Sequence, residues 1–166
     1  AGIVKLLESG QEVAYISDAG TPAVSDPARI LVRTARDAGF DVVPLPGPSA
    51  FTALVSVAGI PGEYETGDLM FAGFLSPREG RRKKRLAALL ETGNAFLLFE
   101  SPYRIVKLIR NLADLDDMRW LCIGREMTKI HEEYIEGPVH KIAESFAGEL
   151  KEKGEFSLLV SGPKKS

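Results

Sequence analysis

The chain has 166 residues, of which 45% are hydrophobic and 27% charged, with a net charge of -2. These values exclude a disordered or fibrous protein, and the length suffices for one or two hydrophobic cores. No apolar run approaches the roughly 20 residues that cross a bilayer, and the first residues lack the pattern of a secretory signal. We therefore expect a cytoplasmic protein that makes no membrane contact.

The cysteine and the two histidines favour neither a disulfide nor a metal centre. Cys122 lies in the apolar run "RWLCIG" and is the only cysteine, so we expect a small buried side chain. His131 and His140 have no cysteine or second histidine at ligand spacing. We therefore predict that no metal is bound.

In the first part of the chain, strand and helix patterns alternate. "AGIVKLLESG" is typical of an amphipathic helix, and residues 12–17 and 41–45 of short buried strands. After the first strand, Asp26 is expected to cap a helix that starts at Pro27 and ends at Gly39, and residues 48–58 form a second helix. This repetition predicts a parallel sheet, with ligands beyond the carboxyl ends of its strands. Two strands are fewer than the usual four to six or so, which indicates a truncated lobe.

The second part has its own strands and helices. Strand patterns occupy residues 69–75, 95–100, 119–124, 132–139 and 156–162, and a helix is predicted over 81–92. Ser101 is expected to cap another helix, which starts at Pro102, and a last helix carries Ile142, Phe146 and Leu150. We predict a mixed sheet covered by helices. The Gly-rich acidic segment 59–68 separates the two α/β lobes, residues 1–66 and 67–166, which carry net charges of -4 and +2.

Two loops follow the strands of the first lobe, "SDAGTPAVSDP" (17–27) and "PLPGPSA" (44–50). Residues of this kind either terminate strands or let backbone groups approach a ligand closely. The glycines match neither the dinucleotide-binding pattern G-x-G-x-x-G nor a P-loop. Composition alone leaves the ligand open.

Six segments, taken together, identify a family. In chain order, "ISDAGTPAVSDPA", "VVPLPGPSAFTALVSVAGIP", "FAGFLSP", "LLFESPYRI", "GREMTKIHEEYIEG" and "KGEFSLLVSG" closely resemble the bacterial ribosomal RNA small-subunit methyltransferase I family, part of the tetrapyrrole-methylase superfamily. The resemblance implies a two-lobed tetrapyrrole-methylase-like fold, a homodimer, and S-adenosylmethionine as methyl donor. It also implies 2′-O-methylation of a cytidine in the 16S rRNA of the small ribosomal subunit. Because family members have a further strand and a Gly-Asn-rich loop upstream, we expect this fragment to bind the donor weakly or to be inactive.

The resemblance also implies which residues bind the donor. They are small residues of the two loops and two residues of the second lobe: Ala19, Gly20, Thr21, Val24, Ser49, Ala50, Glu100 and Met127. Methyl transfer depends mainly on positioning, and a ribose hydroxyl gains from a general base. Glu126 and Lys129 are weak candidates for that base, since they can equally orient the two lobes. The catalytic residue is left unassigned.

A basic run follows the strand at 69–75. "SPREGRRKKR" (76–85) has six basic residues and one glutamate, a local charge of +5. Such a run either contacts phosphates or forms a solvated helix face. We predict RNA contacts by Arg78, Arg81, Arg82, Lys83, Lys84 and Arg85. Besides an rRNA methyltransferase, two alternatives stay open: a tetrapyrrole (corrin/porphyrin) methyltransferase and a non-catalytic binding fragment.

Overall fold

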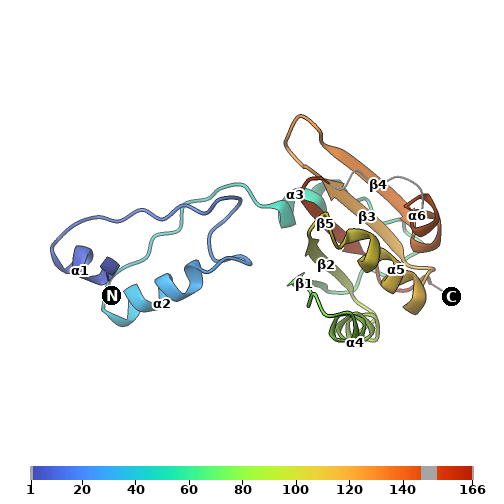
Figure 1. Cartoon of the computed structure of the whole chain (residues 1–166), viewed down its shortest axis with the longest axis horizontal. Helices are drawn as coiled ribbons and strands as arrows, with labels where there is room; N and C mark the ends of the chain where they lie inside the picture. Colours follow the sequence, from blue (N-terminus) through green and yellow to red (C-terminus); the bar gives the residue numbers. More distant parts are fainter. Residues whose placement is uncertain (1, 147–152, 166) are drawn as a thin grey trace. The chain divides into compact units, whose positions relative to one another are not determined.

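A computed structural model describes residues 2–146 and 153–165 of the chain, which divides into two compact units, residues 1–49 and 50–166. Figure 1 shows both, coloured along the sequence. The segment 59–68 is part of the second unit. Its Glu65 N–H donates to the carbonyl of Pro163 at 2.8 Å, and the ring of Tyr64 packs against Trp120. The lobes 1–66 and 67–166 stay a prediction about the whole protein.

The first unit contains the helices α1 (Gly2–Glu8) and α2 (Ala28–Asp37), which pack against each other. Both helices were predicted from the sequence. α2 begins at Ala28 rather than at the predicted Pro27, and the carboxylate of Asp26 accepts the N–H of Ala28 at 2.8 Å. Beyond the other end of α2, Gly39 has a positive φ of 84°, typical of a glycine that ends a helix.

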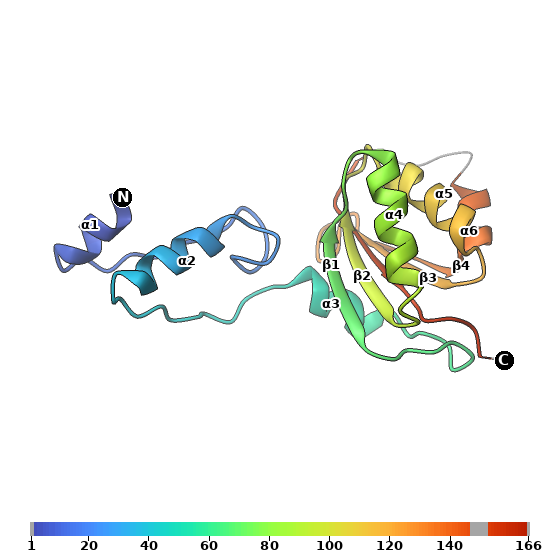
Figure 2. The same cartoon turned by 90° about the horizontal axis from the view of Figure 1, so that it is seen from below.

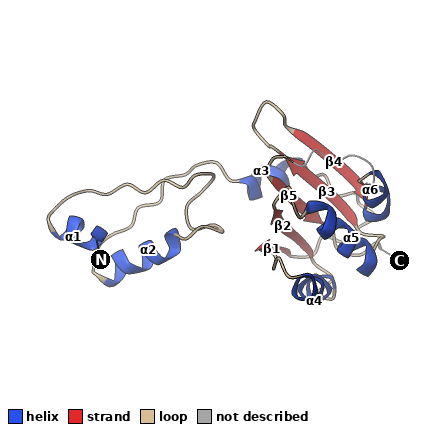
Figure 3. Cartoon of the chain, in the orientation of Figure 1, coloured by secondary structure: helices blue, strands red, loops and turns tan. Residues whose placement is uncertain are grey.

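The two strands predicted for the first unit do not form. Within residues 2–49 the structure contains no strand, and residues 12–17 and 41–45 run as irregular chain, drawn in tan in Figure 3. Ile16 and Leu45 are 90% and 81% exposed. A strand is stable only when its backbone groups pair with a neighbour, and these two segments do not pair. The parallel sheet predicted for this lobe is therefore wrong for this structure.

The second unit is built on one mixed sheet, as predicted. Its strands are β1 (Leu69–Phe74), β2 (Ala95–Glu100), β3 (Trp120–Arg125), β4 (Glu133–Pro138) and β5 (Phe156–Val160). Their order in the sheet is β1-β2-β5-β3-β4. β1 and β2 are parallel, and every other neighbouring pair is antiparallel. β5, the last of these five strands in sequence, therefore lies at the centre.

Helices cover both faces of this sheet. α4 (Glu79–Leu90), α5 (Ile105–Leu115) and α6 (Val139–Ser145) contribute to one apolar cluster, and α3 (Ala50–Val57) to another on the opposite face. Figure 2 shows α4, α5 and α6 together on one side of the strands. α5 begins at Ile105 rather than Pro102, and Ser101 accepts the Ile105 N–H with its carbonyl oxygen instead of capping with its hydroxyl. Leu150, predicted on the last helix, lies outside the described residues.

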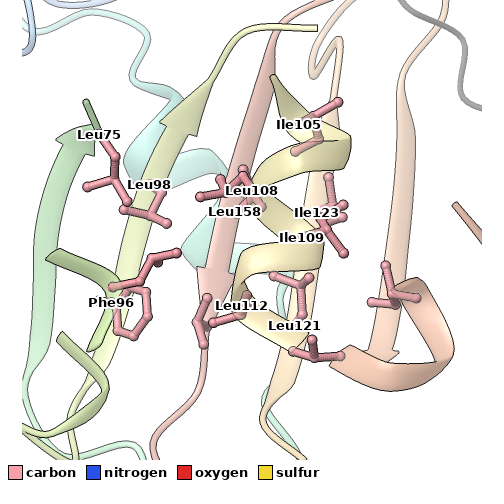
Figure 4. Packing of buried hydrophobic residues seen from close by; sticks show 14 of the residues in the cluster. Leu75, Phe96, Leu98, Ile105, Leu108, Ile109, Leu112, Leu121, Ile123 and Leu158 are labelled. Atoms are coloured by element: carbon pink, nitrogen blue, oxygen red, sulfur yellow. The ribbon is translucent and has the colours of Figure 1, made fainter. Parts of the chain in front are cut away.

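The main core lies between the sheet and α5. Leu98, Ile123 and Leu158 meet Ile105 and Leu108 there, as Figure 4 shows, and all five are buried. Alternate residues of the same strands point to the α3 face, where a smaller cluster is formed by Leu54, Ala58, Leu97, Cys122 and Leu159. Because both faces are covered, the central strands read as unbroken apolar runs. The predicted burial of Cys122 is confirmed.

Candidate functional site

The first unit brings its two Gly- and Pro-rich loops together. The hydroxyl of Thr21 donates to the carbonyl of Pro48 at 3.0 Å, and Ser17 Oγ donates to the carbonyl of Gly20 at 2.7 Å. Gly20 has a φ of 71°, a conformation that residues with a side chain rarely adopt. A side chain at Gly20 would therefore strain the backbone next to the contact between the loops.

The loop at 17–27 also holds strained residues. Ala23 and Ser25 have φ values of 67° and 57°, which are unfavourable for residues other than glycine. Asp26 stabilises this turn, because its Oδ1 accepts the Ala23 N–H at 3.3 Å as well as that of Ala28. Non-glycine residues with such backbone angles occur preferentially at functional sites.

In the second unit, the predicted site residue Glu100 is at the carboxyl end of β2. It pairs in register with Phe156, the first residue of β5, which also pairs with Arg125 at the end of β3. One carboxylate oxygen of Glu100 accepts the Ser101 N–H at 2.7 Å and forms an ion pair with the Arg104 guanidinium, also at 2.7 Å. The other oxygen is buried and has no hydrogen-bond partner among residues 2–146 and 153–165. A buried carboxylate oxygen is costly to leave unpaired, so it is suited to accept a donor from a ligand.

Met127, the other predicted site residue of this unit, follows β3 in a tight turn. Glu126 and Thr128 on either side of it have φ values of 47° and 67°. The half-buried Met127 side chain packs on the α3 face over Gly124, where an added Cβ would lie 2.5 Å from the Met127 sulfur. A side chain at position 124 would therefore displace Met127 from this position, a dependence that the sequence reasoning missed. A glycine inside an otherwise apolar strand is the signal that could have found it.

The weak catalytic candidates, Glu126 and Lys129, form an ion pair with a third residue. Lys129 Nζ lies 3.0 Å from Glu126 Oε1 and 3.1 Å from Glu155 Oε2. Glu126 Oε1 also accepts the Glu155 N–H at 2.8 Å. The hydrogen bond from Lys129 and that from the Glu155 backbone lower the pKa of Glu126, and the two carboxylates raise the pKa of Lys129. Both shifts move the pKa away from neutrality: at neutral pH Glu126 is ionised but a weaker base than usual, and Lys129 stays protonated and cannot accept a proton.

The basic run lies on α4, and the structure divides it into two sets. Arg82 is buried and donates to Asn111 Oδ1 at 2.8 Å and to the carbonyl of Pro77 at 3.2 Å. Lys83 forms an ion pair with Asp114 at 2.9 Å, and the hydrogen bond to Asp114 raises the pKa of Lys83. The other four basic side chains are exposed: Arg78, Arg81, Lys84 and Arg85. We call these four the basic stripe; Arg81, Lys84 and Arg85 lie within one side of α4 by their spacing, and Arg78 is the residue directly before the helix.

The prediction of RNA contact by all six basic residues therefore needs correction for Arg82. Helix periodicity places Arg82 on the buried side of α4, the side that also carries Leu86 and Leu89. The guanidinium is held there by Asn111, a buried polar residue that the sequence reasoning also missed. An asparagine within the apolar stripe of α5 is the signal for such a partner.

In the part of the chain that the structure describes, the remaining polar residues form no group typical of a metal centre. Within residues 2–146 and 153–165, the structure contains no group of three or more His, Cys, Asp or Glu side chains that could hold a metal ion. His131 is exposed, and His140 lies with Nδ1 3.2 Å from the carbonyl of Asp117. Burial raises the pKa of Cys122 to about 11, which keeps its thiol protonated. Of the helices described, none is long and apolar enough to span a membrane.

Comparison with known proteins places the chain in a family. Residues 1–143 match the model of the Tetrapyrrole (Corrin/Porphyrin) Methylases. A protein of Borrelia garinii subsp. bavariensis named ribosomal RNA small subunit methyltransferase I is 40% identical over 96% of this chain and 70% of its own length. One of the same name from Xylella fastidiosa is 40% identical over 96% of this chain and 58% of its own length.

A solved structure supports the same fold. The match to the crystal structure of the methyltransferase CobJ covers 97% of this chain and 69% of the CobJ chain. The TM-score is 0.67, and the sequence identity is 18%. The chain therefore spans only part of each of these proteins, between 58% and 70% of their length. On the family model and on the 40% identity with the Borrelia protein, the chain belongs to the tetrapyrrole methylases and, among them, to the ribosomal RNA small subunit methyltransferase I family.

Proposed function

We propose that the whole protein transfers a methyl group from S-adenosylmethionine to the 2′-hydroxyl of a cytidine in the 16S rRNA of the small ribosomal subunit. The observation that carries the proposal is the 40% identity, over 96% of this chain, with a relative named for that rRNA substrate. As the chain matches 70% of that relative, the proposal concerns the full-length protein. Its place of action would be the cytoplasm, where its ribosomal substrate is.

The residues present fit a methyl donor of this kind. The donor supplies a methyl group on a positively charged sulfur, together with amino and hydroxyl groups that need acceptors. The unpartnered buried oxygen of Glu100 is a suitable acceptor for such a group. Ala19, Gly20, Thr21 and Val24 would contact the donor from the loop at 17–27, and Ser49 and Ala50 from the loop at 44–50. Met127 would provide an apolar contact, consistent with its packing on the α3 face.

The contribution of these residues to the reaction is positioning rather than proton transfer. A displacement at a methyl group requires the attacking oxygen and the departing sulfur to lie in line, and correct placement supplies much of the rate. The ion pairs of Lys129 with Glu126 and Glu155 fix the turn that carries Met127. We therefore assign Glu126 and Lys129 to holding this turn, and leave the general base open.

The alternative, methylation of a tetrapyrrole, is less well supported by the charges. A ring bearing many carboxylates needs free basic side chains in its site. Arg104 is already paired with Glu100, and Arg125 is buried with Glu133 at 3.2 Å. The resemblance to CobJ, at 18% identity, concerns the fold alone.

The experiment uses full-length protein and S-adenosylmethionine with a labelled methyl group. Small subunits from cells that lack this methylation are one substrate, and uroporphyrinogen is the other. We expect label in the 16S rRNA, at a cytidine ribose, and none in the tetrapyrrole. Label in the tetrapyrrole without label in the RNA would show that the tetrapyrrole, and not the rRNA, is the substrate. We also expect the same sample to sediment as a dimer.

A further inference from the structure

The outer sides of α4 and α5 carry an excess of exposed positive charge. α5 adds two exposed cations, Lys107 and Arg110, to the four of the basic stripe. Within the described residues 2–146 and 153–165, none of the six forms an ion pair. The acidic residues of the two helices, Glu79 and Asp114, both pair with Lys83, at 3.5 and 2.9 Å. We call the six cations the basic helix face: Arg78, Arg81, Lys84, Arg85, Lys107 and Arg110.

The exposed sides of α4 and α5 adjoin one another. The ion pair between Lys83 and Asp114 connects the helices through side chains that are 38% and 59% exposed, so it lies at the surface. Lys107 and Arg110 precede Asp114 by seven and four residues, spacings that place them on the same side of α5. Figure 2 shows both helices on one side of the strands. The two cations of α5 therefore extend the surface that carries the stripe.

This arrangement is unfavourable for the helices by themselves. Arg81 and Arg85 are four residues apart, and Lys107 and Arg110 three, and like charges at these spacings repel each other on a helix surface. Cations at the start of α4 also oppose the helix dipole, which favours negative charge there. The whole chain has a net charge of -2, so the cluster does not reflect a generally basic protein. A partner of opposite charge would offset the repulsion.

The composition of the two helices indicates which kind of polyanion fits. α4 and α5 contain no aromatic residue, whereas surfaces for single-stranded nucleic acid stack bases on aromatic rings. Duplex RNA is bound mostly through its phosphates and 2′-hydroxyls. A membrane surface fits less well, because Leu115 is the one large apolar side chain exposed on these helices, and interfacial binding inserts several. A second copy of the chain would bring two positive surfaces together.

We infer that the basic helix face binds a double-helical segment of RNA through its phosphates, with contacts from both α4 and α5. Axes of packed helices lie about 8 to 10 Å apart, so the cations form a surface and not a single row, which suits the two phosphate strands of a stem. Phosphate contacts supply affinity and orientation without reading sequence. The inference rests on the proposed function, and it adds a stem to the cytidine as a part of the RNA that the enzyme recognises.

The test compares binding of two forms of one RNA. Full-length protein is titrated with a fluorescent RNA duplex and with one of its separated strands, and binding is followed by anisotropy at several salt concentrations. Two double variants remove two cations each, Arg81→Ala with Lys84→Ala on α4 and Lys107→Ala with Arg110→Ala on α5. All four side chains are exposed, and circular dichroism verifies that the variants are folded.

Two further proteins are matched to these variants. Arg29→Ala with Arg36→Ala removes the same amount of charge from exposed positions of α2. Asp114→Asn does the reverse, because it removes the carboxylate that neutralises Lys83 and so adds positive charge to the surface. A solvated helix face without a ligand would respond to none of these changes.

Each double variant of α4 or α5 should weaken duplex binding. The slope of log K against log salt concentration should become shallower by about 1.8, at about 0.9 for each phosphate contact on a duplex. Asp114→Asn should bind the duplex more tightly, with a slope steeper by up to about 0.9. The α2 variant should match wild type, and wild type should bind the separated strand more weakly than the duplex.

An unchanged slope in the α5 variant would overturn the inference, since contacts from both helices are required. Tighter binding of the separated strand, weakened by Tyr103→Leu, would also overturn it. Tyr103 is 82% exposed just before α5, and that result would assign the surface to stacked, unpaired bases. Methylation of small subunits by wild type is measured separately. Label in the rRNA with unchanged slopes would reject only this inference, and absence of label would reject the proposed function whatever the slopes.

Discussion

The division of the basic run predicts opposite phenotypes for two adjacent arginines. Arg82→Ala removes the donors to Asn111 Oδ1 and to the carbonyl of Pro77. Asn111 is 4% exposed, so its oxygen would be left without a donor, which costs about 1 to 3 kcal/mol. Pro77 is exposed, and water can replace its lost contact. With the lost packing of the arginine stem, we expect the free energy of unfolding to fall by about 2 to 4 kcal/mol.

Urea unfolding of wild type, Arg82→Ala and Arg81→Ala, followed by circular dichroism, measures this difference. The exposed Arg81 should leave the free energy of unfolding within about 0.5 kcal/mol of wild type. RNA binding is measured on the same samples below the unfolding transition. A fully stable Arg82→Ala protein with a shallower salt slope would refute the assignment of Arg82 to the interior.

Three further predictions concern the sheet and the turn after β3. Gly124→Ala should displace Met127, lowering donor affinity in calorimetry and stability by about 1 to 3 kcal/mol; unchanged affinity would remove Met127 from the donor site. Because the pKa of Glu126 is lowered in the folded state, its contribution to stability is present above the usual value of 4.5 and is lost as pH falls through the folded pKa. Wild type should therefore lose stability relative to Glu126→Gln over that acid range in urea titrations, and parallel pH profiles would contradict this. Cys122 should react with iodoacetamide at pH 8 only in denaturant, and rapid reaction of the native protein would contradict its burial.

The elements of the second unit could be predicted because their patterns are local. The apolar run that ends at Glu100 and the stripe that includes Leu108 each specify an element without knowledge of its partners. The apolar segments around Ile16 and Leu45 have the same local appearance, but a strand also needs a neighbour, and none pairs with them here. Pairing is a property of the whole sheet and is not visible in a short window.

The candidate site was predictable only in part, for a similar reason. Motifs predicted Thr21 and the loop at 44–50 as parts of the donor site, which stays a prediction, and the structure adds the contact between Thr21 and Pro48. The sequence does not distinguish Arg82 from Arg81, because burial depends on which side of α4 packs on the sheet.

The position of β5 has a consequence for synthesis on the ribosome. β5 separates the β1-β2 pair from the β3-β4 pair, yet residues 156–160 are the last of these five strands to leave the exit tunnel. Until then, β2 and β3 each expose an unpaired edge, and the nascent chain cannot close its sheet. We expect ribosome-bound chains that end before Phe156 to be cut rapidly by protease, and chains in which Val160 has emerged to become resistant. Chaperone binding to the nascent protein should follow the same order, with release delayed until the central strand has been inserted.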